Sequence, residues 1–327
     1  MATWQKIFNL YRYDTKNNAE FLNLISKHNL NIEVTENQEK EIKNKDLFEI
    51  SDLSAFIDAY RKNKAISTRM GLIESSFILN EKFNLILDDH NKSENLLDST
   101  YKMKSNTGFY YIKDEDKEAV KEWWIRNTIS AIKKSFLTSC FCVLHYDLIL
   151  WAHLQFKRPF FNWGLLPKIL LQESANKKLL YIGSGIKSIQ CAYDRNVQKA
   201  WRFQIPSFKL SVCQTPQTTT GMYLPDSSIK ETTEKLVDKI VNELSDFDTA
   251  ILGCGAYGPP LINLLSEKLP EKNLIYLGSA CYTMFGIYSH EMPIQCDNDS
   301  IPENWIEVVE ELDPKCGHID GGKYWRK

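Results

Sequence analysis

The sequence of 327 residues lacks the cysteine spacing of a metal site or of a disulfide framework. Its 8 cysteines include no C-x-x-C pair, and the closest two are Cys140 and Cys142. Structural zinc sites usually combine two close cysteine pairs, or one pair with spaced histidines. We therefore expect free, buried thiols in a reducing compartment.

Long apolar runs and a surplus of one charge are also lacking. The most apolar stretch, 141–156, is interrupted by His145, Asp147 and His153 and is shorter than the roughly 20 residues of a bilayer span. No signal-peptide pattern opens the chain. The 40 basic and 42 acidic residues nearly cancel, which argues against a nucleic-acid partner. We expect a cytoplasmic protein with no transmembrane segment, and a peripheral membrane contact is compatible with this composition.

Glycine and proline, at 14 and 11 residues, are too few for a fibrous or low-complexity protein, whereas 43% hydrophobic residues suffice for a full core. Strand patterns and helix patterns alternate along the second half of the chain. They predict strands near 178–183, 208–213, 247–253 and 274–280, and helices over 115–137, 186–203, 227–244 and 259–269. This alternation predicts an α/β fold, with a Rossmann-like parallel sheet and helices on both faces.

The domain organisation follows from the same patterns. Residues 1–64 read as a helical N-terminal segment, and residues 65–327 as one Rossmann-like domain. A soft internal boundary is expected near 157–176, where Lys157-Arg-Pro159 and Pro167 interrupt the pattern.

One glycine-rich string stands between a predicted strand and a predicted helix. It reads Gly253-Cys-Gly255-Ala-Tyr257-Gly258, formally G-x-G-x-x-G. A dinucleotide enzyme needs an acidic residue about 20 positions on, and none stands there. Three interpretations stay open: a site for a nucleotide phosphate, a site for S-adenosylmethionine, and a tight turn that binds nothing.

Two further strings contain groups with possible chemistry. One string is Arg69-Met-Gly71-Leu-Ile-Glu74, in which a guanidinium and a carboxylate flank a glycine turn. The guanidinium has a forked set of donors that suits a diphosphate. A helix that starts with a salt bridge explains the string equally well. Asp88-Asp89-His90 offers ligands for Mn or Mg, although a polar loop explains it as well.

Taken together and in order, these strings resemble a group of glycan-biosynthesis proteins that we connect with glycosyltransferases of the GT-D type. The resemblance covers about residues 65 to 327. It is carried by Arg69-x-Gly71-x-x-Glu74, Asn106-Thr-Gly-Phe-Tyr110, the pair Asp147 and Trp151, Thr218-Thr-Thr-Gly221, 246–258, 276–287 and Gly321-Gly-Lys-Tyr-Trp325.

The resemblance implies transfer of a sugar from a nucleotide donor, expected to be UDP-linked, to a glycan or lipid-linked acceptor. It implies catalytic roles for Glu74 and Asp147. The donor would be bound by the glycines, the arginine and the tyrosines of the matching segments: Arg69, Gly71, Gly253, Gly255, Tyr257, Gly258, Gly278 and Tyr282.

The sequence departs from the family pattern at several positions. The acidic pair that binds a divalent metal in the family is incomplete, because Leu72 stands at its first position. A site for Mn or Mg would then combine Glu74 with Asp88 or Asp89. The second glycine and the glutamine of the later segment are replaced by Ser279 and Tyr282. Two alternatives stay open: a methyltransferase that uses the same glycine turn, and a nucleotide- or glycan-binding module without catalysis, which the missing aspartate at Leu72 favours.

Overall fold

The computed structural model describes residues 50–71, 73–74, 77–78, 81, 99–139, 159–160, 165–195, 197–201, 204–289, 303–311 and 326. Several predicted site residues lie outside these ranges, namely Leu72, Asp88, Asp89, Asp147, Trp151 and the segment 321–325. The first 49 residues of the predicted helical segment also lie outside them.

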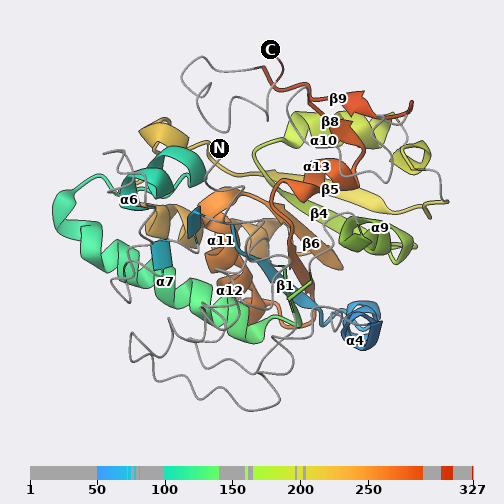
Figure 1. Cartoon of the computed structure of the whole chain (residues 1–327), viewed down its shortest axis with the longest axis horizontal. Coiled ribbons are helices and arrows are strands. Elements are labelled where there is room, and N and C mark those ends of the chain that lie inside the picture. The colour runs from blue at the N-terminus through green and yellow to red at the C-terminus, as the bar shows by residue number, and fades with distance from the viewer. Residues whose placement is uncertain are drawn as a thin grey trace, which may run out of the picture.

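A parallel sheet forms the centre of the described structure (Figure 1). Its strands are β1 (Ile66–Arg69), β2 (Leu137–Ser139), β3 (Pro159–Phe160), β4 (Lys178–Gly183), β5 (Lys209–Gln214), β6 (Thr249–Gly253) and β7 (Asn273–Tyr276). They run in the order β3-β2-β1-β7-β6-β4-β5, and each described pair of neighbours is parallel. The short strands β8 (Ile287–Tyr288) and β9 (Ile306–Glu307) make a separate parallel pair.

Helices flank the sheet as α4 (Ile50–Arg61), α6 (Ser99–Lys102), α7 (Lys117–Lys134), α9 (Leu165–Gln172), α10 (Ile186–Asp194), α11 (Ile229–Glu243), α12 (Gly258–Lys268) and α13 (Ala280–Met284). Shorter helical turns are η2 (Met103–Thr107), η3 (Asp114–Asp116), η4 (Val197–Lys199), η5 (Thr219–Gly221) and η6 (Gly255–Tyr257). The helix predicted over 186–203 is shorter in the structure, since α10 ends at Asp194. None of the described helices has the length and apolarity that crossing a membrane requires.

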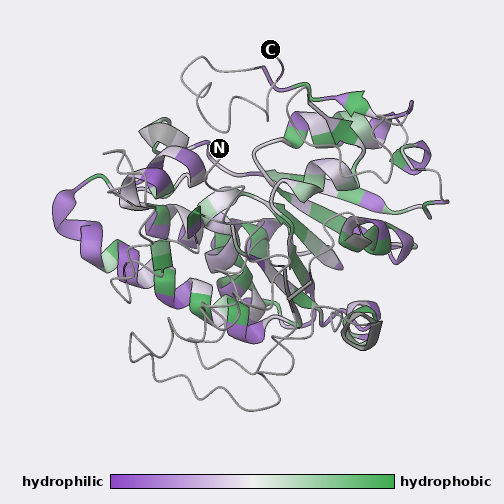
Figure 2. Ribbon diagram, in the orientation of Figure 1, coloured by the Kyte–Doolittle hydropathy of each residue, from purple (hydrophilic) through white to green (hydrophobic). Residues whose placement is uncertain are grey.

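Alternate residues of the central strands enter two different cores. Leu180 and Ile182 of β4 pack in one core with α7, α11 and α12, whereas Leu179 and Tyr181 pack in the other with α4, α9, α10 and α13. Side chains of successive strand residues point to opposite faces, so both faces of the sheet are covered by helices. Figure 2 shows the result as predominantly green central strands beside an α7 of mixed colour. The predicted α/β fold with a parallel sheet and helices on both faces is confirmed.

Candidate functional site

The direction in which the strand order grows changes between β4 and β6. After β4 the chain passes through α10 to β5 at the outer edge, whereas after β6 it passes through α12 to β7 on the opposite side. Because β4 and β6 are neighbours, the loops that follow them diverge. In open α/β sheets, ligands bind at the carboxyl ends of strands at such a divergence.

Predicted site residues from distant parts of the chain meet at this edge. Arg69 ends β1, Gly278 follows β7, and Gly253 ends β6, and these three strands are adjacent in the sheet. Gly278 has a φ of 59°, and a Cβ placed on it would overlap Nη1 of Arg69. The guanidinium of Arg69 therefore lies directly against the backbone that follows β7.

Glu74 lies in the segment that follows β1 and Arg69. Its side chain is buried and turns back over Gly71, where a Cβ would overlap Oε2 of the carboxylate. Both charges also act on the hydroxyl of Tyr276 in β7. Burial raises the pKa of Tyr276 well above its usual value, the nearby Glu74 raises this pKa further, and Arg69 lowers it. The structure thus brings together the cation and the carboxylate that the sequence predicted for one site.

The glycine turn at 253–258 is held by buried donors on its inner side. Tyr276 Oη donates to the carbonyl oxygen of Gly255 at 3.0 Å, and Trp124 Nε1 donates to that of Ala256 at 2.7 Å. Gly255 has a φ of 53°, and a Cβ there would meet the carbonyl oxygen of Thr107. These contacts require glycine at position 255, because a side chain has neither the space nor the preferred backbone conformation.

The first turn of α12 offers few free N–H groups for an anion. Pro259 and Pro260 stand in that turn and have no N–H. The N–H groups of Tyr257 and Gly258 donate to carbonyl oxygens within the turn, those of Cys254 and Gly255. An anion at this helix would therefore depend on the backbone N–H groups of 254–256 and on Arg69.

Cys254 lies within the glycine turn, where its burial disfavours the nucleophilic thiolate form. It is buried, and burial raises the pKa of its thiol well above the usual value. Burial likewise raises the pKa of neighbouring Cys281, which the Arg69 charge lowers in part. The thiolate is the reactive form of cysteine, so burial disfavours reaction at both thiols. The four described cysteines, Cys191, Cys213, Cys254 and Cys281, form no disulfide.

Tyr257 is directed into the protein. Its Oη lies 3.0 Å from Oγ1 of Thr218, which in turn donates to the carbonyl oxygen of Gly108 at 2.7 Å. Burial raises the pKa of Tyr257. The hydrogen bonds join three separate segments of the family resemblance, those around Gly108, Thr218 and Tyr257. Contact between Tyr257 and a donor sugar stays a prediction.

A second glycine turn, Gly183-Ser184-Gly185, follows β4 and was not among the predicted site residues. Gly183 pairs with Gly253 in the sheet, so the two turns lie side by side. Tyr282 of α13 reaches this turn, because a Cβ on Gly185 would overlap its hydroxyl. The sequence contains the pattern that indicates this turn, because its two glycines stand between a buried strand and a helix.

Glu310 is the other residue that sequence reasoning missed. It follows β9, and its carboxylate accepts hydrogen bonds from the N–H of Ser188, at 2.9 Å, and from the Ser188 hydroxyl. Ser188 is in the first turn of α10, where the helix dipole favours a negative charge. Only the fold brings this segment beside the turn at 183–185, so no local pattern could have indicated it.

The described residues do not by themselves make a divalent metal site. Among them, no group of three or more His, Cys, Asp or Glu side chains lies close enough together to hold an ion. Glu74 is one carboxylate, whereas Mg²⁺ and Ca²⁺ sites draw on several oxygen ligands. The predicted contributions of Asp88 and Asp89 lie outside the described residues.

Comparisons of the chain with known proteins found no match. The chain matches no protein-family model, no curated protein and no solved structure. The resemblance to GT-D glycosyltransferases therefore stays a prediction from the sequence, and the site stands on its own geometry.

Proposed function

We propose that the chain is a glycosyltransferase that moves a sugar from a nucleotide donor, UDP-linked by preference, to a glycan or lipid-linked acceptor. One observation supports this proposal above the others. Arg69, Glu74 and the 253–258 turn all lie at the carboxyl ends of adjacent strands in the sheet. Doubly wound sheets bind nucleotides at this edge, and these groups suit a diphosphate that must leave.

In the proposed reaction, the bond between the anomeric carbon and the diphosphate oxygen breaks, and the acceptor oxygen bonds to that carbon. The diphosphate leaves with the bonding electrons, and Arg69 neutralises its growing charge with a forked set of N–H donors. The proton of the acceptor hydroxyl passes to a carboxylate, for which Glu74 is the candidate among the described residues. No step is assigned to a metal, because the described residues do not make a site for one.

Thermal unfolding with UDP, GDP and CMP sugars, with and without Mn, tests the proposal. Ligand at about 100 times its dissociation constant stabilises a protein by roughly 2.7 kcal/mol, which shifts the melting temperature visibly. Stabilisation by a UDP sugar, lost in Arg69→Ala and retained in Arg126→Ala on the exposed side of α7, would support it. Absence of a shift with every nucleotide would overturn it.

Turnover separates a transferase from a binding module. Glu74→Gln should lower sugar transfer by at least about 100-fold if Glu74 accepts the proton. Transfer close to that of the wild type would remove this role from Glu74. Binding of UDP without transfer to any acceptor would favour the module without catalysis, and binding of S-adenosylmethionine in place of UDP would favour the methyltransferase.

A further inference from the structure

Lys121 of α7 is a buried cation that has no part in the candidate site described above. The residue is 7% exposed, and lysine is almost never buried to this extent unless it is paired. Its Nζ lies 2.5 Å from Oε2 of Glu81 and 3.1 Å from Oε1 of Glu118. Burial lowers the pKa of Lys121, but its hydrogen bonds to the two carboxylates outweigh burial and raise this pKa above its usual value. The ammonium group is therefore charged and depends on its partners.

The two partners of Lys121 differ in what they connect. Glu118 belongs to α7 itself, three residues before Lys121, and its side chain is 77% exposed. Glu81 belongs to the segment that follows β1, and its side chain is only 20% exposed. An ion pair within one helix positions no other element, whereas the pair with Glu81 joins α7 to the segment that bears Glu74.

Glu81 and Glu74 lie on one face of a helical stretch. Residues 73, 74, 77, 78 and 81 are helical, and 77, 78 and 81 follow Glu74 by three, four and seven positions. Positions with this spacing share one face of a helix. The face points into the protein, because Glu74, Phe77 and Ile78 are buried. Glu74 stands at the end of this face near the candidate site, and Glu81 stands at the other end, against Lys121.

The middle of this face packs against aromatic rings. The ring of Phe77 lies 5.5 Å from that of Phe109 and 5.7 Å from that of Trp124, between centroids. Trp124 also donates to the carbonyl oxygen of Ala256 in the glycine turn. Apolar packing is non-directional, so it permits small rotations of the stretch. The ion pair between Glu81 and Lys121 joins two defined atoms and limits such rotations.

We infer that Lys121 is a positioning residue for Glu74, acting through Glu81 and the helical face that the two glutamates share. The ion pair fixes one end of the face, and the carboxylate of Glu74 is thereby held at the other end. The effect of Lys121 on turnover rests on the proposed function, in which Glu74 accepts the acceptor proton. Its effect on the order of residues 73–81 does not.

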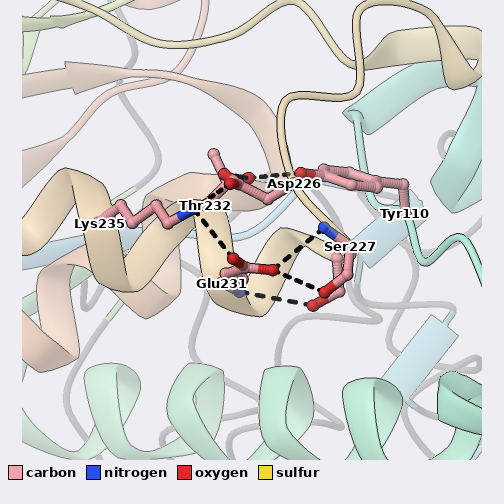
Figure 3. A network of polar contacts seen from close by, with 7 residues as sticks. Tyr110, Asp226, Ser227, Glu231, Thr232 and Lys235 are labelled. Atoms are coloured by element: carbon pink, nitrogen blue, oxygen red, sulfur yellow. Dashed lines mark hydrogen bonds and ion pairs between the residues drawn. The ribbon is translucent and has the colours of Figure 1, made fainter.

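The alternative is that Glu81 only balances the charge of Lys121. Lys235 of α11 shows the surface form of such an arrangement, because it is shared by Asp226 and Glu231 and its side chain is 61% exposed (Figure 3). Exposed ion pairs of this kind contribute little to stability. If charge balance were the whole role of Glu81, Glu118 would serve Lys121 equally well. Glu118 is therefore the matched control for Glu81.

Hydrogen exchange of the backbone amides at 73–81, measured on the full chain, tests the inference. Glu81→Gln and Glu118→Gln each remove one charge that faces Lys121 and keep the length of the side chain. We expect exchange at least about tenfold faster in Glu81→Gln, because a charged hydrogen bond between two elements is lost, and unchanged exchange in Glu118→Gln. Equal rates in the two variants would overturn the inference.

Lys121→Met and Lys134→Met provide a second comparison, which decides the matter if Glu81→Gln fails to fold. Lys134 is also on α7, but its Nζ donates to the side chains of Asn263, at 2.7 Å, and of Glu267, at 2.8 Å, both on α12. Faster exchange at 73–81 in Lys121→Met alone supports the inference. Equal exchange in both methionine variants would assign the effect to α7 as a whole and overturn it.

Steady-state kinetics separate positioning from a general loss of stability. With the UDP sugar that stabilises the wild type, kcat should fall at least about tenfold in Glu81→Gln while KM for the sugar donor stays unchanged, because Glu74 is displaced and Arg69 is not. A rise in KM with unchanged kcat would overturn the inference. Faster exchange in Glu81→Gln alone, with no UDP binding by the wild type, would sustain the inference and refute the proposed function.

Discussion

Arg69 and Gly278 lie so close that the arginine occupies the space where a side chain on the glycine would stand. Arg69 ends β1, and Gly278 follows the neighbouring strand β7. The guanidinium of Arg69 can therefore occupy this position only because residue 278 has no side chain. Substitution of a glycine can test the site without removing any functional group.

Gly278→Ala should destabilise the protein and displace Arg69. Alanine at a positive φ costs about 1–2 kcal/mol, and here the overlap with Arg69 adds to that cost. Gly221→Ala is the control, since Gly221 has a φ of 75° with open space around the position of its Cβ. Urea unfolding should show the larger loss at 278, and isothermal titration should show weaker UDP binding in that variant alone. An equal loss of stability in the Gly278→Ala and Gly221→Ala variants would mean that Arg69 can move aside without cost.

Trp124→Phe should loosen the glycine turn. The change leaves the buried carbonyl oxygen of Ala256 without its indole donor, at a cost of about 1–3 kcal/mol. Trp305→Phe is the matched control, because Nε1 of Trp305 donates to the carbonyl oxygen of Ala200 at 2.8 Å in the other core. Both variants should lose stability in urea, but only Trp124→Phe should speed amide exchange at 254–257. Unchanged exchange there would separate Trp124 from the turn.

Glu310→Gln should weaken the attachment of the segment that follows β9. A carboxylate bound at the N-terminus of a helix contributes up to about 2 kcal/mol in a partly buried position, and the neutral amide loses most of that. Glu311→Gln changes the exposed neighbouring residue and should have little effect. Chemical denaturation measures the difference in stability, and exchange at 303–310 locates it. A similar loss in both variants would argue against the helix contact as its source.

Stability should fall in acid through Glu231. Hydrogen bonds from the Ser227 hydroxyl and from Lys235 lower the pKa of Glu231 from 4.5 to about 2. Because the folded state holds this proton less tightly than the unfolded state, the contribution is present above pH 4.5 and is lost as the pH falls toward 2. In Glu231→Gln that part of the pH dependence should be absent. Unfolding free energies at several pH values in this range measure it, and parallel profiles would contradict it.

The fold could be predicted from the sequence because its signals are local. A buried strand at 178–183 and an amphipathic helix at 227–244 are visible in the order of apolar residues, and the structure contains β4 and α11 there. The order of strands in the sheet was not accessible in this way. Which strands become neighbours depends on the packing of helices on both faces, and no short stretch of sequence records that.

The candidate site was predictable in part. Arg69, Glu74 and the 253–258 turn were found because their residue types and glycine spacing are unusual. The turn at 183–185 gives the same kind of signal, but it lacks the G-x-G-x-x-G spacing. The inward direction of Tyr257 could not be seen, because its hydrogen-bond partner Thr218 is far from it in the chain.

The sequence by itself determined the alternation of strands and helices and the glycines at the ends of two strands, because backbone preference and hydrophobic period act over neighbouring residues. Only the tertiary structure decided that Arg69 lies against Gly278, that Glu310 meets Ser188 and that the hydroxyl of Tyr257 meets that of Thr218. Parallel strands are joined by long crossovers, so residues at their carboxyl ends become neighbours only when the whole sheet has assembled.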